Sequence, residues 1–297
     1  GELIKIQNNK LISSKNIQYL EIAKNNQDKD FKEIENSLLE EIVSSVKLQS
    51  KTVRSIGSHL SGGVDSTLLT LMLSQVHKNI NTYTFGYEEK EYDEREKARL
   101  TSNALKIPNY SSILRFEDID NWLLETLKAH DEPFTSLRQL SHLKLYKDFK
   151  DKGSTVIFEA SGGDEIGAGY KGMIWPLFLD ESLELGYEKA FRNLQYRSEN
   201  RNLANKFTDF ITQSSINSVR YGICTSDGTY SSSIAYLKNK NKVKESIINN
   251  RNKEIPFNTF LQNSQYYEIS STKLPRGLRY IDRSSSYSGR EARVPLL

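Results

Sequence analysis

The stretch Ser61-Gly62-Gly63-Val64-Asp65-Ser66 separates an apolar run that ends at Leu60 from an apolar pattern with helical spacing. Residues 53–60 predict a short strand, and residues 66–76 predict a buried helix. Gly62 and Gly63 allow a tight turn that brings backbone N–H groups close to a ligand. The unpaired N–H groups at a helix start attract anions. The stretch therefore predicts a phosphate-binding turn between a strand and a helix.

The side chains of this turn fit a nucleotide that is bound with a metal ion. Ser61 and Ser66 offer hydroxyl donors, whereas Asp65 suits a phosphate only if a divalent cation such as Mg²⁺ lies between them. No Gly-Lys-Ser/Thr follows, which excludes the lysine-containing P-loop. An ordinary strand-to-helix turn is the alternative for Gly-Gly alone, and the six residues together favour a nucleotide site.

Strand and helix patterns alternate up to about residue 170. Further strands are predicted at residues 80–87, 110–114 and 155–160, with helices at 93–106, 122–129 and 137–149. Strands separated by helices imply an α/β fold with a parallel sheet. Residues 1–22 predict a hairpin with Asn8-Asn9 between its strands, and helical spacing starts at Phe31. Beyond residue 170, the predicted helices are 177–186, 189–201, 204–214 and 243–250.

A second turn follows the strand at 155–160 and reads Ser161-Gly162-Gly163-Asp164-Glu165. Ligands of parallel sheets bind beyond the carboxyl ends of the strands, so this turn can face the first one. Asp164 would then lie opposite Asp65, and the two carboxylates could share Mg²⁺ on a leaving pyrophosphate. Taken alone, the second turn is equally well explained as a flexible turn.

The two turns resemble those of the ATP pyrophosphatases, and the chain resembles the synthetase domain of glutamine-dependent asparagine synthetases and their relatives, the β-lactam synthetases. The further matching stretches are Tyr92-Asp93-Glu94, Asp131-Glu132-Pro133, Asp282-Arg283 and Glu291-Ala292-Arg293-Val294-Pro295-Leu296-Leu297. Gly1-Glu2-Leu3-Ile4-Lys5-Ile6 resembles the end of the family's glutaminase domain. The resemblance spans most of the chain and is weakest at residues 171–257.

The resemblance implies a doubly wound, mostly parallel sheet with a mainly helical C-terminal part. It also implies that a carboxylate attacks the α phosphate of ATP, that pyrophosphate leaves, and that ammonia displaces AMP. The catalytic residues implied are Asp65, Asp164 and Glu165, with Asp65 and Asp164 as Mg²⁺ ligands. Nucleotide-binding positions are Ser61, Gly62, Gly63, Asp65, Ser66, Ser161 and Gly162, together with Leu60, Phe85, Glu159 and Ala160 near adenosine. Strand packing is an equal alternative for the last four.

The chain departs from the family at the second turn. Ser161 occupies the place of a family glutamate that is implicated in forming or resolving the adenylate, and a serine cannot act as a carboxylate base. Glu159 lies on the same face two residues earlier and could substitute only if the strand end changed register. Adenylation is therefore expected, whereas aspartate as the substrate is in doubt.

The expected domain organisation is a glutaminase remnant at 1–22, a linker at 23–32 and a synthetase domain at 33–297. The synthetase domain divides into an α/β core at about 33–170 and a helical part at about 171–297. Because the chain begins with Gly1 and ends in an apolar run, we expect a fragment that lacks the glutaminase cysteine and the family's late lysine. Expected partners are a carboxylate such as aspartate, ammonia and the upstream glutaminase domain. The oligomeric state is open, a homodimer included.

Composition excludes several classes of function. The net charge of +3 is too balanced for a protein whose main partner is nucleic acid. The single cysteine, Cys224, excludes an internal disulfide and fits a reducing compartment. No apolar run approaches about 18 residues, so no membrane span is expected, and the cytoplasm is the default location.

Several residues are assigned structural or surface roles. His59, His77, His130 and His142 show no metal-ligand spacing, and Cys224 has no evident catalytic partner. The basic run at 238–242 is expected to be a solvated loop. Asp93 is a predicted N-cap, with a functional role for Asp93 and Glu94 as an equal alternative. Arg283 and Arg293 are expected to pair with Asp282 and Glu291, with substrate binding as the alternative.

Three hypotheses remain after this reading. The leading one is ATP-dependent amidation of a carboxylate, of aspartate or of a different acid. The second is a tRNA-modifying ATP pyrophosphatase, which shares only the first turn and would need a basic surface. The third is a non-catalytic descendant that binds nucleotide, and Ser161 keeps this one open.

Overall fold

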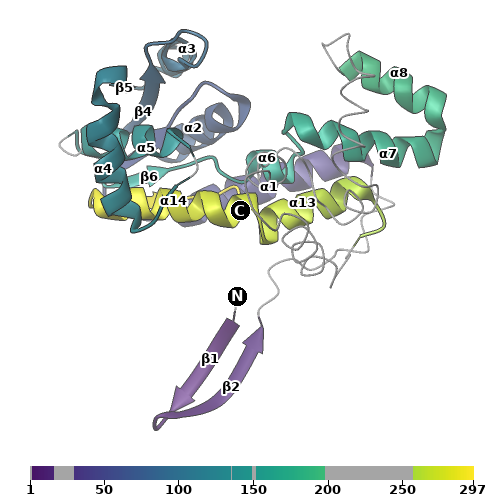
Figure 1. The fold of residues 1–297 in the computed structure, drawn as a ribbon, viewed down its shortest axis with the longest axis horizontal. Coiled ribbons are helices and arrows are strands. Elements are labelled where there is room, and N and C mark those ends of the chain that lie inside the picture. The colour runs from purple at the N-terminus through teal and green to yellow at the C-terminus, as the bar shows by residue number, and fades with distance from the viewer. Residues whose placement is uncertain (1, 17–29, 135, 149–151, 198–256) are drawn as a thin grey trace, which may run out of the picture. The chain divides into compact units, whose positions relative to one another are not determined.

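The computed structural model describes residues 2–16, 30–134, 136–148, 152–197 and 257–297 (Figure 1). The chain divides into two compact units, Gly1–Glu40 and Glu41–Leu297. The smaller unit contains an antiparallel hairpin of β1 (Glu2–Gln7) and β2 (Lys10–Asn16). Asn8 and Asn9 join the strands with positive φ angles of 50° and 58°, a backbone conformation that asparagine tolerates in tight hairpin turns. The predicted hairpin and its Asn8-Asn9 turn are confirmed for residues 2–16, whereas residues 17–22 of the predicted range lie outside the described residues.

Helix α1 (Phe31–Gln49) carries the boundary between the two units. It includes Phe31 and Lys32, which the sequence assigned to the linker, because the helical spacing of apolar residues already starts at Phe31. Residues 23–29, which make up most of the predicted linker, lie outside the described residues. Near the other end of the helix, Val46 is buried.

The larger unit is built on a five-stranded sheet with the order β5-β4-β3-β6-β7. Every neighbouring pair in this sheet is parallel. The strands are β3 (Ile56–His59), β4 (Ile80–Tyr87), β5 (Asn109–Leu114), β6 (Val156–Phe158) and β7 (Glu291–Arg293). The sequence predicted the first four, with β3 longer than observed: Val53 is fully exposed and precedes the strand. It missed β7, whose three residues carry two charges and no apolar pattern.

Helices cover both faces of the sheet. One apolar cluster joins β3, β4 and β6 to α2 (Val64–Val76) and to Val46 of α1. A second cluster joins β4 and β6 to α5 (Arg138–Asp148) through Leu145 and Tyr146. Val156 and Phe158 of β6 point into the first cluster and Ile157 into the second. The sheet is therefore doubly wound, as predicted.

Two further helices before residue 170 follow the predicted order, α3 (Arg95–Leu105) and α4 (Ile119–His130). The 3₁₀ turn η1 (Phe116–Asp118) and the short α6 (Gly163–Ile166) were not predicted. Asp93 does not cap α3 directly, because the helix is preceded by Glu94, whose side chain forms no cap. The Asp93 carboxylate instead accepts the backbone N–H of Arg95 and pairs with its guanidinium.

The C-terminal part is helical where it is described. Its elements are η2 (Lys171–Met173), α7 (Ile174–Leu185), α8 (Tyr187–Arg197), α13 (Phe260–Ser270) and α14 (Lys273–Tyr287). Asp180 of α7 accepts the backbone N–H groups of Phe260 and Leu261 and so caps α13. Helix α14 packs against α4, α5 and β7, which ties the C-terminal part to the sheet. The predicted helices at 204–214 and 243–250, Cys224 and the run at 238–242 lie outside the described residues.

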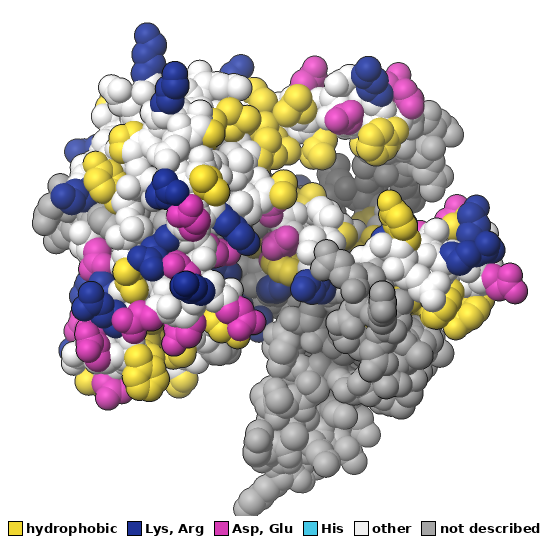
Figure 2. All heavy atoms as spheres, turned by 90° about the horizontal axis from the view of Figure 1, so that it is seen from above, with side chains coloured by type: hydrophobic (Ala, Val, Ile, Leu, Met, Phe, Trp, Pro, Cys, Tyr) yellow, Lys and Arg dark blue, Asp and Glu magenta, His cyan; other side chains and the backbone are white. Residues whose placement is uncertain are grey.

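Two observations concern membrane-spanning helices and surface charge. Within the described ranges, no helix combines the length and apolar character needed to cross a membrane. Basic and acidic side chains are intermixed on the face shown in Figure 2, without a continuous basic patch over the described part of that face.

Candidate functional site

The first turn lies between the end of β3 and the start of α2. Gly62 has a φ of +78°, a conformation that favours glycine. A Cβ atom there would lie 2.6 Å from Cβ of Lys97 and 2.7 Å from its backbone carbon, so α3 leaves no room for a side chain. Gly63 precedes α2 without a side-chain cap. The turn therefore presents a helix N-terminus suited to an anion.

Ser61 and Ser66 hold the shape of this turn. Their hydroxyls lie 2.9 Å apart, and Oγ of Ser66 accepts the N–H of Ser61 at 3.2 Å. Oγ of Ser61 also accepts the N–H of Gly63 at 3.3 Å. The sequence assigned both hydroxyls to phosphate binding. In the structure they bond within the turn, and both residues also line a cavity in front of it.

The second turn follows β6 and is partly helical. Gly162 has a φ of +101°, and the side chain of Leu297 lies directly against it. Gly163, Asp164 and Glu165 form the start of α6, whereas the sequence was read as a loop here. A residue far away in the sequence stabilises this helical turn: the side chain of Gln265 in α13 donates a hydrogen bond to the carbonyl of Ile166. Such a contact leaves no local sequence signal.

The sheet register brings the two turns together. Ile56 pairs with Val156 and Ser58 with Phe158, so β3 and β6 end side by side. A Cβ atom on Gly163 would lie 2.5 Å from Oδ2 of Asp65, which places the Asp65 carboxylate against α6. Burial, followed by repulsion from Asp164 and Glu165, raises the pKa of Asp65 above its ordinary value. Asp65 and Asp164 therefore lie close enough for their charges to repel, which agrees with the prediction that the two turns face each other.

Glu165 is the most buried of these three carboxylates. Its side chain accepts the hydroxyl of Tyr170 at 2.6 Å, and the residue is only 5% exposed. Burial and the bond to Glu165 raise the pKa of Tyr170, so its hydroxyl stays a donor. This bond orients one oxygen of Glu165.

A divalent cation suits this group of carboxylates. Asp65 carries the cost of two like-charged neighbours, and Mg²⁺ prefers carboxylate oxygens together with those of a bound phosphate. Asp65 and Asp164 are the residues that would hold it, because both line the cavity in front of the helix N-terminus. An ion there would remove the repulsion that now raises the pKa of Asp65.

The turns open onto a cavity of about 750 Å³. The predicted site residues that line it are Ser61, Gly63, Asp65, Ser66, Glu159, Ala160, Ser161, Gly162, Asp164 and Glu165. Gly62, Leu60 and Phe85 are not among its lining residues. Gly62 shapes the turn from behind. Most of the site residues predicted from the sequence therefore line the cavity at the carboxyl ends of β3 and β6.

Leu60 and Phe85 lie within the sheet and its core. Leu60 is fully buried; its N–H donates to Tyr83 at 2.8 Å, and its carbonyl accepts from Thr84 at 2.7 Å. Phe85 is 5% exposed and packs in the cluster beneath α5. These contacts are the strand packing that was the alternative for both residues.

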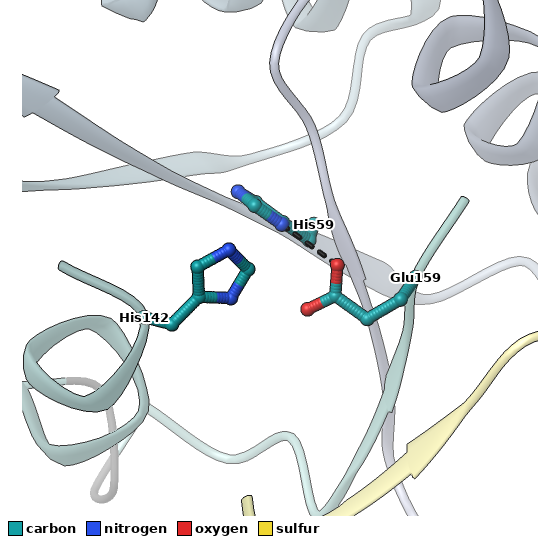
Figure 3. A group of neighbouring side chains, drawn as sticks. All are labelled: His59, His142 and Glu159. Carbon is teal, nitrogen blue, oxygen red and sulfur yellow. Dashed lines mark hydrogen bonds and ion pairs between the residues drawn. The ribbon is translucent and has the colours of Figure 1, made fainter. Parts of the chain in front are cut away.

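His59, His142 and Glu159 form a cluster that the sequence did not indicate (Figure 3). Nδ1 of His59 lies 2.8 Å from Oε2 of Glu159, and the His59 and His142 rings meet edge to face with centroids 5.1 Å apart. The sequence assigned structural or surface roles to His59 and His142 and did not predict that they are neighbours; the end of β3 and α5 bring them together. Spacing along the chain carries no sign of this.

The protonation of this cluster is set by burial and by its partners. Burial by itself raises the pKa of Glu159, but attraction to His59 and the hydrogen bonds of His59 and Tyr146 lower it to about 2. Removal from water lowers the pKa of His142 to about 3. Near pH 7, Glu159 is therefore ionised and His142 is neutral.

Basic side chains also line the cavity. Arg138 of α5 and Lys273 and Arg276 of α14 line it, together with the small residue Gly277. The sequence did not predict these three basic residues as site residues. Lys273 and Arg276 lie in a segment that has no glycine-rich turn and matches no motif. The cavity therefore has an acidic wall at the two turns and a basic wall at α14.

The other family-like stretches have structural partners. Arg283 pairs with Asp131 at 2.8 Å, and one turn earlier Arg279 pairs with Glu132 at the same distance. The expected pairing of Arg283 with Asp282 was wrong, because α14 faces the end of α4. Arg293 does pair with Glu291, at 2.8 Å, as expected.

His77 and His130 have the structural roles that were expected. Nε2 of His77 lies 3.0 Å from the carbonyl of Ser50. His130 is buried, and its Nε2 lies 3.1 Å from the hydroxyl of Ser284, which joins α4 to α14. Neither ring belongs to the cavity lining.

Comparison with known proteins places these motifs in a family. Residues 37–297 match the family profile described as Asparagine synthase. "Asparagine synthetase [glutamine-hydrolyzing] 1" of Bacillus subtilis is 29% identical over 153 residues, which are 52% of this chain and 23% of that protein. "Putative asparagine synthetase [glutamine-hydrolyzing] 2" of Methanocaldococcus jannaschii is 26% identical over 149 residues, 48% of this chain and 28% of that protein. The matched region thus spans about a quarter of either relative.

Solved structures with some likeness include two NAD synthetases. The glutamine-dependent enzyme of Acinetobacter baumannii, in complex with ADP, has a TM-score of 0.35 at 12% identity, covering 46% of this chain and 27% of that chain. The NH3-dependent enzyme of Campylobacter jejuni has a TM-score of 0.33 at 15% identity, covering 59% and 92%. These scores are low, and the fold described above rests on the sheet itself.

Proposed function

Because the chain belongs to the asparagine synthase family, we propose that it activates a substrate carboxylate with ATP and releases pyrophosphate. The observation that carries the proposal is the pair of facing turns at one end of the cavity, with a helix N-terminus and three neighbouring carboxylates. The family match extends over both turns and α14, and it weighs against the tRNA-modifying alternative. ATP use is the expected common chemistry of the family.

In the proposed reaction, the turn after β3 binds the β and γ phosphates of ATP. Its backbone N–H groups offset their charge, and Asp65 and Asp164 hold Mg²⁺, which would stabilise the charge that develops on the leaving pyrophosphate. Ser61 and Ser66 keep the turn in shape for binding. The substrate carboxylate attacks the α phosphate, and ammonia then displaces AMP. In the full-length protein, an upstream glutaminase domain would supply the ammonia, and we propose a cytoplasmic location.

The basic wall is the proposed position of the substrate carboxylate. Arg138, Lys273 and Arg276 line the same cavity as the two acidic turns, so an anionic substrate is attracted to them. Aspartate is one such substrate. A different carboxylate is favoured by the second turn, because Ser161 cannot act as a base and Glu159 has one oxygen bonded to His59 and the other to Tyr146.

ATP–pyrophosphate exchange with a panel of carboxylates tests the proposal on the full-length protein. Exchange that requires aspartate would identify asparagine synthesis, and exchange with another acid would identify that acid as the substrate. ATP binding without exchange across the panel contradicts the proposed activity and favours a non-catalytic role.

A pair of variants on α14 tests the basic wall. Arg276→Ala should raise the KM for the carboxylate by roughly 10-fold or more, the scale of one lost hydrogen bond to a charged group. Arg279→Ala is the matched control, because Arg279 lies on the same helix and pairs with Glu132. Equal effects of the two variants on KM would overturn the assignment of this wall to the substrate.

A further inference from the structure

We propose that His59, His142 and Glu159 form a binding site for a transition-metal ion of the Zn²⁺ type, open to the cavity (Figure 3). The three side chains come from the end of β3, from α5 and from the residue that follows β6. Each offers one ligand atom, and these atoms all lie within 4.8 Å of one another. The inference goes beyond the proposed reaction, because it concerns a second ion at a different part of the cavity.

The spacing of the ligand atoms is close to that of a metal site. Around a tetrahedral zinc ion with bonds of about 2.0–2.1 Å, ligand atoms lie about 3.3 Å apart. Nδ1 of His59 and Oε2 of Glu159 are 2.8 Å apart, so this pair needs little movement. The third ligand atom needs a shift of at most roughly 1.5 Å to reach the same spacing.

His142 can make this shift at low cost. Its Nδ1 is buried, and among the described residues it has no hydrogen-bond partner. A buried nitrogen without a partner is unfavourable, and coordination by a metal ion would satisfy it. The ring is only partly covered by protein and lines the cavity, so it has space to turn.

The donor set selects a different ion from the one expected at the two turns. Imidazole nitrogens suit Zn²⁺ and its neighbours in the first transition row, whereas Mg²⁺ prefers oxygen ligands. The Asp65 and Asp164 wall offers carboxylate oxygens, and this cluster offers two imidazoles and one carboxylate. The two parts of the cavity therefore have distinct ion preferences.

The surroundings of the cluster are those of a metal site with ordered outer partners. The Tyr146 hydroxyl donates to Oε1 of Glu159 at 2.6 Å, which leaves Oε2 directed at His59. The Phe85 ring lies 5.0 Å from the centroids of both imidazoles and shields them on one side. All three ligands line the cavity, so a fourth position is open to water or to a bound molecule.

Metal titration tests the proposal without any need for activity. The protein is first freed of metal with a chelator and then titrated with Zn²⁺ in excess Mg²⁺ by calorimetry. We expect one equivalent of Zn²⁺ per chain, and X-ray absorption should show two imidazole nitrogens and carboxylate oxygen around it. Co²⁺ at the same site should give the visible absorption of a low-coordinate complex.

Variants separate this site from other zinc-binding groups. His142→Ala and Glu159→Gln should each weaken Zn²⁺ binding by more than the roughly 10- to 100-fold that removal of an outer partner costs, and Tyr146→Phe should fall within that range. His77→Ala, Cys224→Ser and Asp164→Asn are controls that remove an imidazole, the single thiol and a Mg²⁺ ligand, and they should leave the affinity unchanged.

Three results would overturn the proposal. They are the absence of stoichiometric Zn²⁺ binding, wild-type affinity in His142→Ala, and loss of the site in Asp164→Asn. Thermal melting shows whether Glu159→Gln, a change at a buried residue, still folds; if it does not, His142→Ala decides alone. Lack of ATP–pyrophosphate exchange in a protein that binds one Zn²⁺ would overturn the proposed function and leave this site standing.

Discussion

The two glycine turns beside the cavity carry similar residues but are held in place in different ways. Bonds within six residues fix the first turn, where the hydroxyls of Ser61 and Ser66 bond to each other and to the backbone. Partners from elsewhere hold the second turn: Leu297 lies against Gly162, and Gln265 binds the carbonyl of Ile166. The first turn is thus locally determined, and the second depends on the C-terminal part of the chain.

This difference separates the two halves of the proposed reaction. The locally fixed turn presents the helix N-terminus that suits phosphate, a group common to every ATP-dependent reaction. The second turn carries Ser161, where the chain departs from its family, and it contacts Leu297 and Gln265 from the C-terminal part of the chain. We infer that changes in the C-terminal part leave phosphate binding intact but impair the reaction with the carboxylate substrate.

The largest predicted effect concerns the carboxylate that each turn contributes to the proposed Mg²⁺ site. Asp65→Asn and Asp164→Asn should each lower ATP–pyrophosphate exchange by on the order of 10²–10³-fold, the scale for loss of one electrostatic contact to a developing charge. Equal losses are expected, because one carboxylate from each turn holds the ion. Rates at saturating ATP and Mg²⁺ provide the measurement. Glu132→Gln, which removes a carboxylate paired with Arg279 outside the cavity lining, should keep most of the activity.

Glycine replacements test how each turn is held. Gly62→Ala should destabilise the protein by about 1–3 kcal/mol, because alanine at φ +78° is strained and its Cβ meets the backbone of Lys97. Gly162→Ala is also strained, at φ +101°, but it should cost less because its Cβ meets the side chain of Leu297, which can move, and not a backbone. Urea unfolding of both variants measures the difference. A larger cost at Gly162 would contradict the contrast between the turns.

The sequence predicted those features that depend on neighbouring residues. The first turn and four strands follow from short-range glycine chemistry and from apolar periodicity, whereas the doubly wound arrangement was implied by the resemblance to the asparagine synthetases. The His59–His142–Glu159 cluster and the pairing of Arg283 with Asp131 did not follow, because the sheet order and the packing of α5 and α14 create them. Strand β7 escaped notice because three residues with two charges show no strand pattern, and only pairing with β6 makes them a strand.

Truncation of Leu297 should affect the second turn alone. Leu297→Ala removes the side chain that lies against Gly162, and because Leu297 is 44% exposed the cost should be about 1 kcal/mol, below that of a fully buried leucine. Exchange should fall with little change in ATP affinity, because the first turn keeps its own bonds. Leu183→Ala on α7 is the matched control, since Leu183 is 80% exposed. A parallel loss of ATP affinity in Leu297→Ala would show that the two turns are not held independently.

The smallest effect shows where the two turns are nevertheless coupled. Burial and the carboxylates of Asp164 and Glu165 raise the pKa of Asp65, so its ionised form opposes folding at neutral pH. The favourable contribution of Asp65 is complete below its unfolded pKa of 3.8 and is lost as the pH rises through the higher folded pKa. Asp65→Asn should therefore raise Tm slightly at pH 7.5, and this gain should shrink as the pH falls towards 3.8.

The Tm values of the wild type and of Asp65→Asn, measured with and without Mg²⁺, test whether the two turns bind one Mg²⁺ ion together. Mg²⁺ should raise the Tm of the wild type more than that of Asp65→Asn, because it compensates the carboxylates that repel one another across the two turns. Melting curves with Mg²⁺ and with a chelator, alongside the exposed control Glu91→Gln, provide the measurement. If Asp65→Asn lowers Tm at pH 7.5, charge does not couple the turns. In that case the bonds within the first turn, not repulsion from the second, determine how Asp65 contributes to stability.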